Sequence, residues 1–162
     1  MAGAPWWKGT RGEWYVVVQV MLIVLIAVGP RTWGGWPPWP FPGGWAVMLG
    51  GSALLIGGAC LAGGGIVRLG KALTPLPYPR ENAVLRETGA YRWVRHPMYC
   101  GVLLAALGWS LVSRGWLTLA YVAMAFVFIV FKVRREEKWL VERFPGYRAY
   151  QRRVRKLIPF LY

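Results

Sequence analysis

Four apolar segments, separated by polar and basic connections, constrain the fold of this chain more than any other feature. They run over residues 15–28, 45–69, 97–112 and 116–144. Apolar residues make up 56% of the 162-residue chain and charged residues only 16%, and a soluble domain of this size cannot bury so much hydrocarbon. A helix of about 20 residues crosses the apolar core of a bilayer. We therefore expect an all-α, polytopic membrane protein with about four transmembrane helices, the last of which continues as a helix beyond the membrane from Lys132 onward.

The distribution of basic residues predicts how these helices are oriented. The chain has a net charge of +14, and all but Arg31 and Arg114 of its 20 Lys and Arg residues lie in the amino terminus, the 68–95 loop or the carboxyl tail. Cytoplasmic loops carry an excess of basic residues. We expect one multi-pass domain over residues 1–162 with both termini and this loop in the cytoplasm. Because the basic residues flank apolar segments, their expected partners are membrane lipids and not nucleic acid.

The first apolar segment has a second interpretation as a cleaved signal peptide, because basic residues precede it. No small-residue cleavage site follows it, and Pro30 and Trp33 are typical of the end of a retained helix. We therefore expect this helix to stay in the protein.

The second apolar segment carries glycines in two series with seven-residue spacing. The series are Gly50, Gly57 and Gly64, and Gly51, Gly58 and Gly65. Such spacing places small residues on one helix face, where another helix can approach closely, so we expect these glycines to serve packing. An alternative is that a glycine near Gly64 leaves room for a cofactor. We also expect the glycine faces of this segment and of the next, which has Gly101 and Gly108, to leave an opening toward the lipid.

The only histidine of the chain lies where a basic loop meets the third apolar segment. Residues 89–101 read Gly-Ala-Tyr-Arg-Trp-Val-Arg-His-Pro-Met-Tyr-Cys-Gly. Since Pro97 suits the first turn of a helix, one interpretation is that His96 simply precedes a helix start. On the other interpretation, the aromatic rings, guanidinium groups and imidazole of this segment hold a charged small molecule.

Other chemistry-bearing residue types are too few for several classes of site. The spacing of the two cysteines, Cys60 and Cys100, suits no metal site, and we expect no disulfide between them because both lie in the bilayer region. With one histidine and no aspartate, the chain has neither a Ser-His-Asp triad nor a histidine-rich metal cluster. We therefore expect no metal, and we expect the chemistry to come largely from a cofactor.

Two separated motifs resemble those of the integral-membrane isoprenylcysteine carboxyl methyltransferase and phospholipid methyltransferase superfamily. The first is Arg95-His96-Pro97-Met98-Tyr99, preceded by Gly89-x-Tyr91. The second comprises Glu136, Glu137, Phe144, Tyr147, Tyr150 and Pro159. The similarity covers residues 66–162, the expected catalytic half. It implies S-adenosylmethionine-dependent methylation of a lipid-like or prenylated substrate that partitions into the membrane.

The resemblance also implies which residues contact the cofactor in a pocket that faces the cytoplasm. They are Glu136 in the second motif, Tyr91, His96, Pro97, Met98 and Tyr99 in the first, and a covering loop segment of Ala83, Val84, Leu85 and Arg86. S-adenosylmethionine has an ammonium group and hydroxyls that need an acceptor, a carboxylate that needs donors, and a sulfonium that suits aromatic faces. We expect the basic tail after Phe144 to attract anionic lipid headgroups and to cap this pocket.

The two adjacent glutamates are expected to differ in role, because neighbours on a helix point about 100° apart. Glu136 is expected to face inward, since it follows Ile129 by seven residues and Lys132 by four. Glu137 is either a surface residue that balances nearby basic side chains or part of the site. The catalytic candidates are Arg95, Lys132 and Glu137. Lys132 falls where the resemblance places a substrate-binding arginine, whose bidentate fork a lysine lacks. No general base is needed for a carboxylate or thiolate acceptor.

Two other functions are compatible with these residues. A nicotinamide-dependent membrane reductase of the sterol-reductase type shares a His-Pro-x-Tyr step and a carboxyl end like residues 158–162, although more than four spans would be expected of it. A non-catalytic membrane adaptor would use the basic tail to hold lipid or a partner. Binding of NADPH would indicate the reductase, and an adaptor would bind neither cofactor.

Overall fold

The computed structural model describes residues 12–38, 44–70 and 84–158. In chain order, its elements are α1 (Glu13–Val28), α2 (Gly44–Leu69), the 3-10 helix η3 (Gly89–Arg92), α3 (Pro97–Ser113), α4 (Trp116–Arg143) and α5 (Tyr147–Arg153). Within these residues every regular element is helical, and Val94 and Arg155 form an isolated parallel bridge. The all-helical class is confirmed, and the four apolar helices begin and end within two residues of the predicted bounds.

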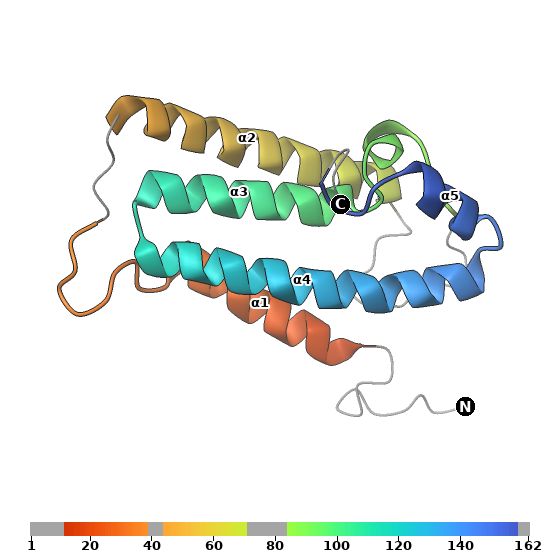
Figure 1. The fold of residues 1–162 in the computed structure, drawn as a ribbon, viewed down its shortest axis with the longest axis horizontal. Coiled ribbons are helices and arrows are strands. Elements are labelled where there is room, and N and C mark those ends of the chain that lie inside the picture. Colours follow the sequence, from red (N-terminus) through yellow and green to blue (C-terminus); the bar gives the residue numbers. More distant parts are fainter. Residues whose placement is uncertain (1–11, 39–43, 71–83, 159–162) are drawn as a thin grey trace.

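The four long helices lie side by side in the order α2, α3, α4, α1 (Figure 1). Helix α3 packs mainly on α2 and also on α4, which in turn contacts α1. Helix α4 extends past the amino-terminal end of α3, and α5 folds back over that extension (Figure 1). The predicted continuation of α4 beyond its apolar part is thereby confirmed. Because η3 and the start of α3 lie at the same end, the motif residues of both halves can meet there.

Two of the helices are long and apolar enough to cross a membrane. They are α2 with 26 residues and α4 with 28. Helices α1 and α3, with 16 and 17 residues, are apolar but shorter than a typical span of about 20. Large apolar side chains such as Trp14, Met48, Ile56 and Phe131 are exposed on α1, α2 and α4, and soluble monomers rarely expose such extensive apolar surface. A membrane setting accounts for this exposure, and the number of spans stays a prediction.

Helices α2 and α3 approach closely because glycines of each face the backbone of the other. A Cβ atom on Gly58 would lie 2.4 Å from the backbone nitrogen of Ala105, and one on Gly101 would lie 2.5 Å from that of Ala62. The other glycines with crowded positions at this interface are Gly51, Gly65 and Gly108. In contrast, the series Gly50, Gly57 and Gly64 has no such atom within 4 Å. Only the second predicted glycine series therefore packs a helix.

The opening expected between the glycine faces of α2 and α3 is not there, and that expectation is wrong. Gly101 and Gly108 do not leave room, because the backbone of α2 occupies the space beside them. A glycine near Gly64 likewise does not line the pocket described below. Any entry from the membrane must use another face of α3.

Replacing each of two adjacent glycines on α2 by alanine tests this packing. Gly58→Ala places a methyl group against the backbone of α3, so we expect a loss of about 1 to 3 kcal/mol in the free energy of unfolding. Gly57→Ala points into open space and should be neutral. Thermal unfolding in detergent measures both, and equal destabilisation of the two variants would contradict the assigned interface.

Candidate functional site

A pocket lies at the end of the bundle where α4 extends past its neighbours. It is lined by residues from α2, the loop before η3, η3, the start of α3, α4 and α5, namely Leu69, Leu85, Arg86, Tyr91, Arg95, His96, Pro97, Met98, Tyr99, Glu136, Leu140, Tyr147 and Tyr150. Segments distant in the sequence thus bring one carboxylate, several basic groups and four tyrosine rings around one space.

Most of the residues predicted to hold a cofactor line this pocket. They are Leu85, Arg86, Tyr91, His96, Pro97, Met98, Tyr99 and Glu136. Val84 is exposed and does not line it, and Ala83 lies outside the described residues. The two motifs are therefore brought together in space, while the binding role of these residues stays a prediction.

Tyr99, in the first turn of α3, holds Glu136 at the pocket. The hydroxyl of Tyr99 donates to Oε2 of Glu136 at 3.0 Å, and the Tyr99 ring stacks on the His96 ring with centroids 5.7 Å apart. Pro97 occupies the start of α3 directly after His96, where its missing N–H group costs no hydrogen bond. The interpretation of His96 as a residue before a helix start and its interpretation as a pocket residue both hold.

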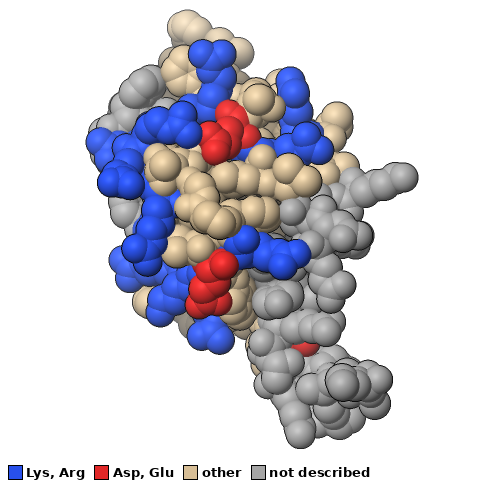
Figure 2. All heavy atoms as spheres, turned by 90° about the vertical axis from the view of Figure 1, so that its right-hand side faces the viewer, with Lys and Arg blue, Asp and Glu red and all other residues tan. Residues whose placement is uncertain are grey.

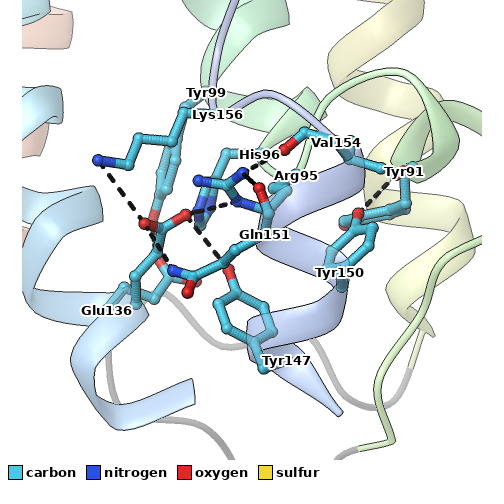
Figure 3. A network of polar contacts seen from close by, with 11 residues as sticks. Tyr91, Arg95, His96, Tyr99, Glu136, Tyr147, Tyr150, Gln151, Val154 and Lys156 are labelled. Carbon is cyan, nitrogen blue, oxygen red and sulfur yellow. Dashed lines mark hydrogen bonds and ion pairs between the residues drawn. The ribbon is translucent and has the colours of Figure 1, made fainter. Parts of the chain in front are cut away.

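Glu137 lies on a different face of α4 and is buried, with an exposed fraction of 6%. Five side chains surround its carboxylate: Arg95 Nε at 2.7 Å, Gln151 Nε2 at 3.2 Å, His96 Nε2 at 3.3 Å, the Tyr147 hydroxyl at 3.4 Å and Lys156 Nζ at 3.7 Å. Figure 3 labels these five side chains. The interpretation of Glu137 as a surface residue is wrong, because the carboxyl tail folds back over this face of α4. Its carboxylate holds the scaffold of the site and does not line the pocket.

Arg95 ties the tail to the beginning of α3. Besides its ion pair with Glu137, its guanidinium donates to the backbone carbonyls of Gln151, at 3.1 Å, and Val154. The backbone N–H of Arg95 donates to the carbonyl of Arg155 at 2.8 Å. Arg95, a catalytic candidate, lines the pocket, but its guanidinium is already paired with Glu137 and with carbonyls of the tail.

Lys132, the remaining catalytic candidate, lies behind the pocket. Its side chain is buried, with an exposed fraction of 1%, and it does not line the pocket. The ammonium lies 5.2 Å from the centroid of the Tyr99 ring and donates to the side-chain oxygen of Gln19 in α1. Lys132 therefore contacts the site through Tyr99.

Two pocket residues of the tail, Tyr147 and Tyr150, were not predicted as site residues. Both are buried, and the Tyr150 hydroxyl donates to the backbone carbonyl of Tyr91 at 2.5 Å. Burial raises the pKa of the Tyr147, Tyr150 and Tyr91 hydroxyls, that of Tyr91 to about 12. These tyrosines therefore stay neutral and can act as hydrogen-bond donors. Their three-residue spacing, which places them on one helix face, was the available signal. The basic residues between and after them concealed the short helix α5.

Basic side chains surround the end of the molecule that carries the pocket (Figure 2). Exposed examples are Arg134, Arg135 and Lys138 on α4 and Arg148 and Arg152 on α5. Such a surface attracts anionic lipid headgroups and anionic ligands. Within residues 12–38, 44–70 and 84–158, no group of three or more His, Cys, Asp or Glu residues is arranged to hold a metal ion.

Removing the Glu137 carboxylate tests its role in holding the tail. Glu137→Ala leaves the Arg95 guanidinium buried without its ion-pair partner, so we expect a loss of about 3 to 5 kcal/mol in the free energy of unfolding. Glu142→Ala, at an exposed position of the same helix, is the matched control and should change it by less than about 0.5 kcal/mol. Chemical or thermal unfolding in detergent measures the difference, and similar stabilities would show that the cluster does not hold the tail.

Three curated relatives are similar in sequence to part of this chain. Protein-S-isoprenylcysteine O-methyltransferase of Saccharomyces cerevisiae is 38% identical over 84 residues, covering 48% of this chain and 34% of the relative. The cobalt-zinc-cadmium resistance protein CzcN of Cupriavidus metallidurans is 34% identical over 83 residues, covering 51% and 38%. Methanethiol S-methyltransferase 1 of Bradyrhizobium diazoefficiens is 34% identical over 93 residues, covering 57% and 30%.

The chain spans about a third of the length of these relatives. A family model described as phospholipid methyltransferase matches residues 45–146. This match covers more than half of the chain and includes the pocket residues of α2, η3, α3 and α4. The chain therefore belongs to the phospholipid methyltransferase family.

Proposed function

We propose that this protein is an S-adenosylmethionine-dependent methyltransferase whose acceptor carries a hydrocarbon tail. The observation that carries the proposal is the Glu136 carboxylate, held by Tyr99 in a pocket of tyrosine rings and basic groups. Membership of the family supports methyl transfer, and two of the three relatives are named as methyltransferases.

The residues of the pocket fit the chemical groups of this cofactor. The Glu136 carboxylate is an acceptor for its ammonium group or its ribose hydroxyls, and Arg86 of the loop offers donors for its carboxylate. The rings of Tyr91 and Tyr99 present faces that favour a sulfonium. When bound, S-adenosylmethionine supplies a methyl group that its sulfonium already activates.

The contribution of the protein is alignment of the reacting atoms. Methyl transfer is a displacement in which nucleophile, methyl carbon and leaving sulfur lie in line. Fixed orientation alone can lower the activation free energy by about 7 kcal/mol or more. The Tyr99–Glu136 hydrogen bond and the stacked His96 ring fix one wall of the pocket. Since a carboxylate or thiolate acceptor needs no general base, neutral tyrosines are adequate for this chemistry.

We place the hydrocarbon tail of the acceptor in an apolar groove of about 410 Å³ between α3 and α4. The groove is lined by Cys100, Leu103, Leu104, Leu107, Leu119, Val122, Ala123, Phe126, Val127, Leu157 and Ile158. One end adjoins the pocket, because Cys100 of the groove follows the pocket residue Tyr99 in α3. An acceptor in the groove would have its reactive head near the pocket while the tail stays in hydrocarbon, where each buried CH₂ contributes about 0.8 kcal/mol.

We further propose that the chain crosses the membrane several times with the pocket and both termini in the cytoplasm. The basic side chains around the pocket support this orientation (Figure 2), since cytoplasmic segments carry the excess of Lys and Arg. The cofactor is charged and reaches the pocket from water. Only the acceptor needs access from the lipid.

Substitution of Glu136 tests the cofactor assignment. We expect Glu136→Ala to weaken S-adenosylmethionine binding by about 10- to 100-fold, because an acceptor for a charged or polar group is lost, while Glu142→Ala leaves binding unchanged. Calorimetry on the purified protein in detergent measures the affinity. Undiminished affinity in Glu136→Ala would refute the assignment. Retention of NADPH without S-adenosylmethionine would instead indicate a reductase, and binding of neither would indicate an adaptor.

A matched pair of substitutions tests the groove. Among acceptors that share one reactive head, we expect kcat/KM to rise with tail length. Ala123→Phe fills the groove and should reduce methylation of long-tailed acceptors at least tenfold without changing cofactor affinity. Met124→Phe, at the next residue, is exposed outside the groove and should have little effect. A small water-soluble acceptor that is methylated best, and equally by both variants, would show that the groove holds no tail.

A further inference from the structure

A polar contact between α1 and α4 lies directly behind the pocket. Gln19 is the one strongly polar residue of the apolar segment 15–28, and its side-chain oxygen accepts a hydrogen bond from the Lys132 ammonium. Lys132 is buried, and its ammonium lies 5.2 Å from the centroid of the Tyr99 ring. The Tyr99 hydroxyl in turn donates to Glu136 in the pocket at 3.0 Å. Four side chains thus connect α1 with the pocket carboxylate.

Packing of α1 on α4 does not by itself account for this contact. An ammonium group and an amide in an apolar interior cost free energy unless both are paired. Two leucines at these positions would join the helices without that cost. A role for the Gln19–Lys132 pair therefore lies in the effect of the ammonium on the Tyr99 ring beside it.

We propose that Gln19 is a positioning residue, which holds the Lys132 ammonium against the Tyr99 ring so that the Tyr99 hydroxyl stays directed at Glu136. The inference rests on the proposed function of the pocket as the cofactor site. A cation at a tyrosine face is attracted to the ring, so a fixed ammonium restrains the orientation of the Tyr99 ring and of its hydroxyl. Lys132 and Glu136 are also four residues apart on one helix face. The acceptor on α1, Gln19, therefore fixes the position of the ammonium relative to the Glu136 carboxylate.

This role brings a further helix to bear on the site. Helix α1 precedes residues 45–146, the part of the chain that matches the family model. The rings of Tyr15 in α1 and Phe128 in α4 also contact each other, with centroids 5.9 Å apart. Because an aromatic contact also holds α1 on α4, removal of the Gln19–Lys132 hydrogen bond should affect the pocket more than it affects the packing of α1.

Binding measurements on the full chain in lipid nanodiscs, with S-adenosylmethionine as the probe, test this inference. We expect Gln19→Leu to weaken the affinity about 3- to 10-fold, because the lost hydrogen bond acts on the pocket indirectly, through Tyr99, and to lower the unfolding temperature, because the buried Lys132 ammonium loses an acceptor. Gln19→Glu keeps an acceptor for the ammonium and should restore the affinity to within about twofold of the wild type. Val20→Leu, at an exposed neighbouring position, is the matched control.

Combination with Tyr99→Phe separates positioning from a general effect on the fold. In that background the hydroxyl is absent, so Gln19→Leu should cause no further loss of affinity. A full additional loss there, or an unchanged affinity of Gln19→Leu in the otherwise wild-type protein, would overturn the positioning role while the cofactor assignment stands. A wild-type protein without affinity for S-adenosylmethionine would overturn the proposed function and this inference together.

Discussion

The buried carboxylate of Glu137 is the contact on which the geometry of the site depends. A carboxylate is tolerated in an interior only when several donors surround it, and here these donors come from the start of α3 and from the tail. Tyr147, one of the donors, also lines the pocket, and Tyr150 on the same short helix does so as well. The contact of the tail with Glu137 therefore also places the tyrosines that form one wall of the pocket.

Helix geometry divides two adjacent acidic residues between two tasks. Glu137 is surrounded by cations and donors, which makes its carboxylate a strong scaffold and a poor binding group for a ligand. Glu136, turned by about 100° on the helix, lies at the pocket beside Tyr99. A sequence of two neighbouring glutamates thus supplies the fixed charge that holds the site and the acceptor that faces a ligand, with no additional element between them.

Features set by local sequence were predictable, and those set by long-range packing were not. The four apolar helices follow from runs of apolar residues and from breakers such as Pro97, so their bounds were predicted closely. The two motifs located most of the pocket. Helix α5 is short and rich in arginine, and only its docking reveals the burial of Glu137. Both glycine series of α2 have the same spacing, so the packed one is decided by the rotation of α2 against α3, which the sequence does not show.

The tight contact between α2 and α3 determines where a lipid-like molecule can reach the site. On one side of α3, glycines bring the two backbones together and close that side. On the other side, leucines of α3 and apolar residues of α4 such as Phe126 face each other across the apolar groove, which can widen by side-chain rotation without moving a backbone. A rigid α2–α3 pair thus makes the α3–α4 seam the adaptable one. That seam ends beside the pocket, where α4 passes from its apolar part to its charged part. A charged cofactor can therefore approach this point from water, and a hydrophobic acceptor can approach it from the lipid.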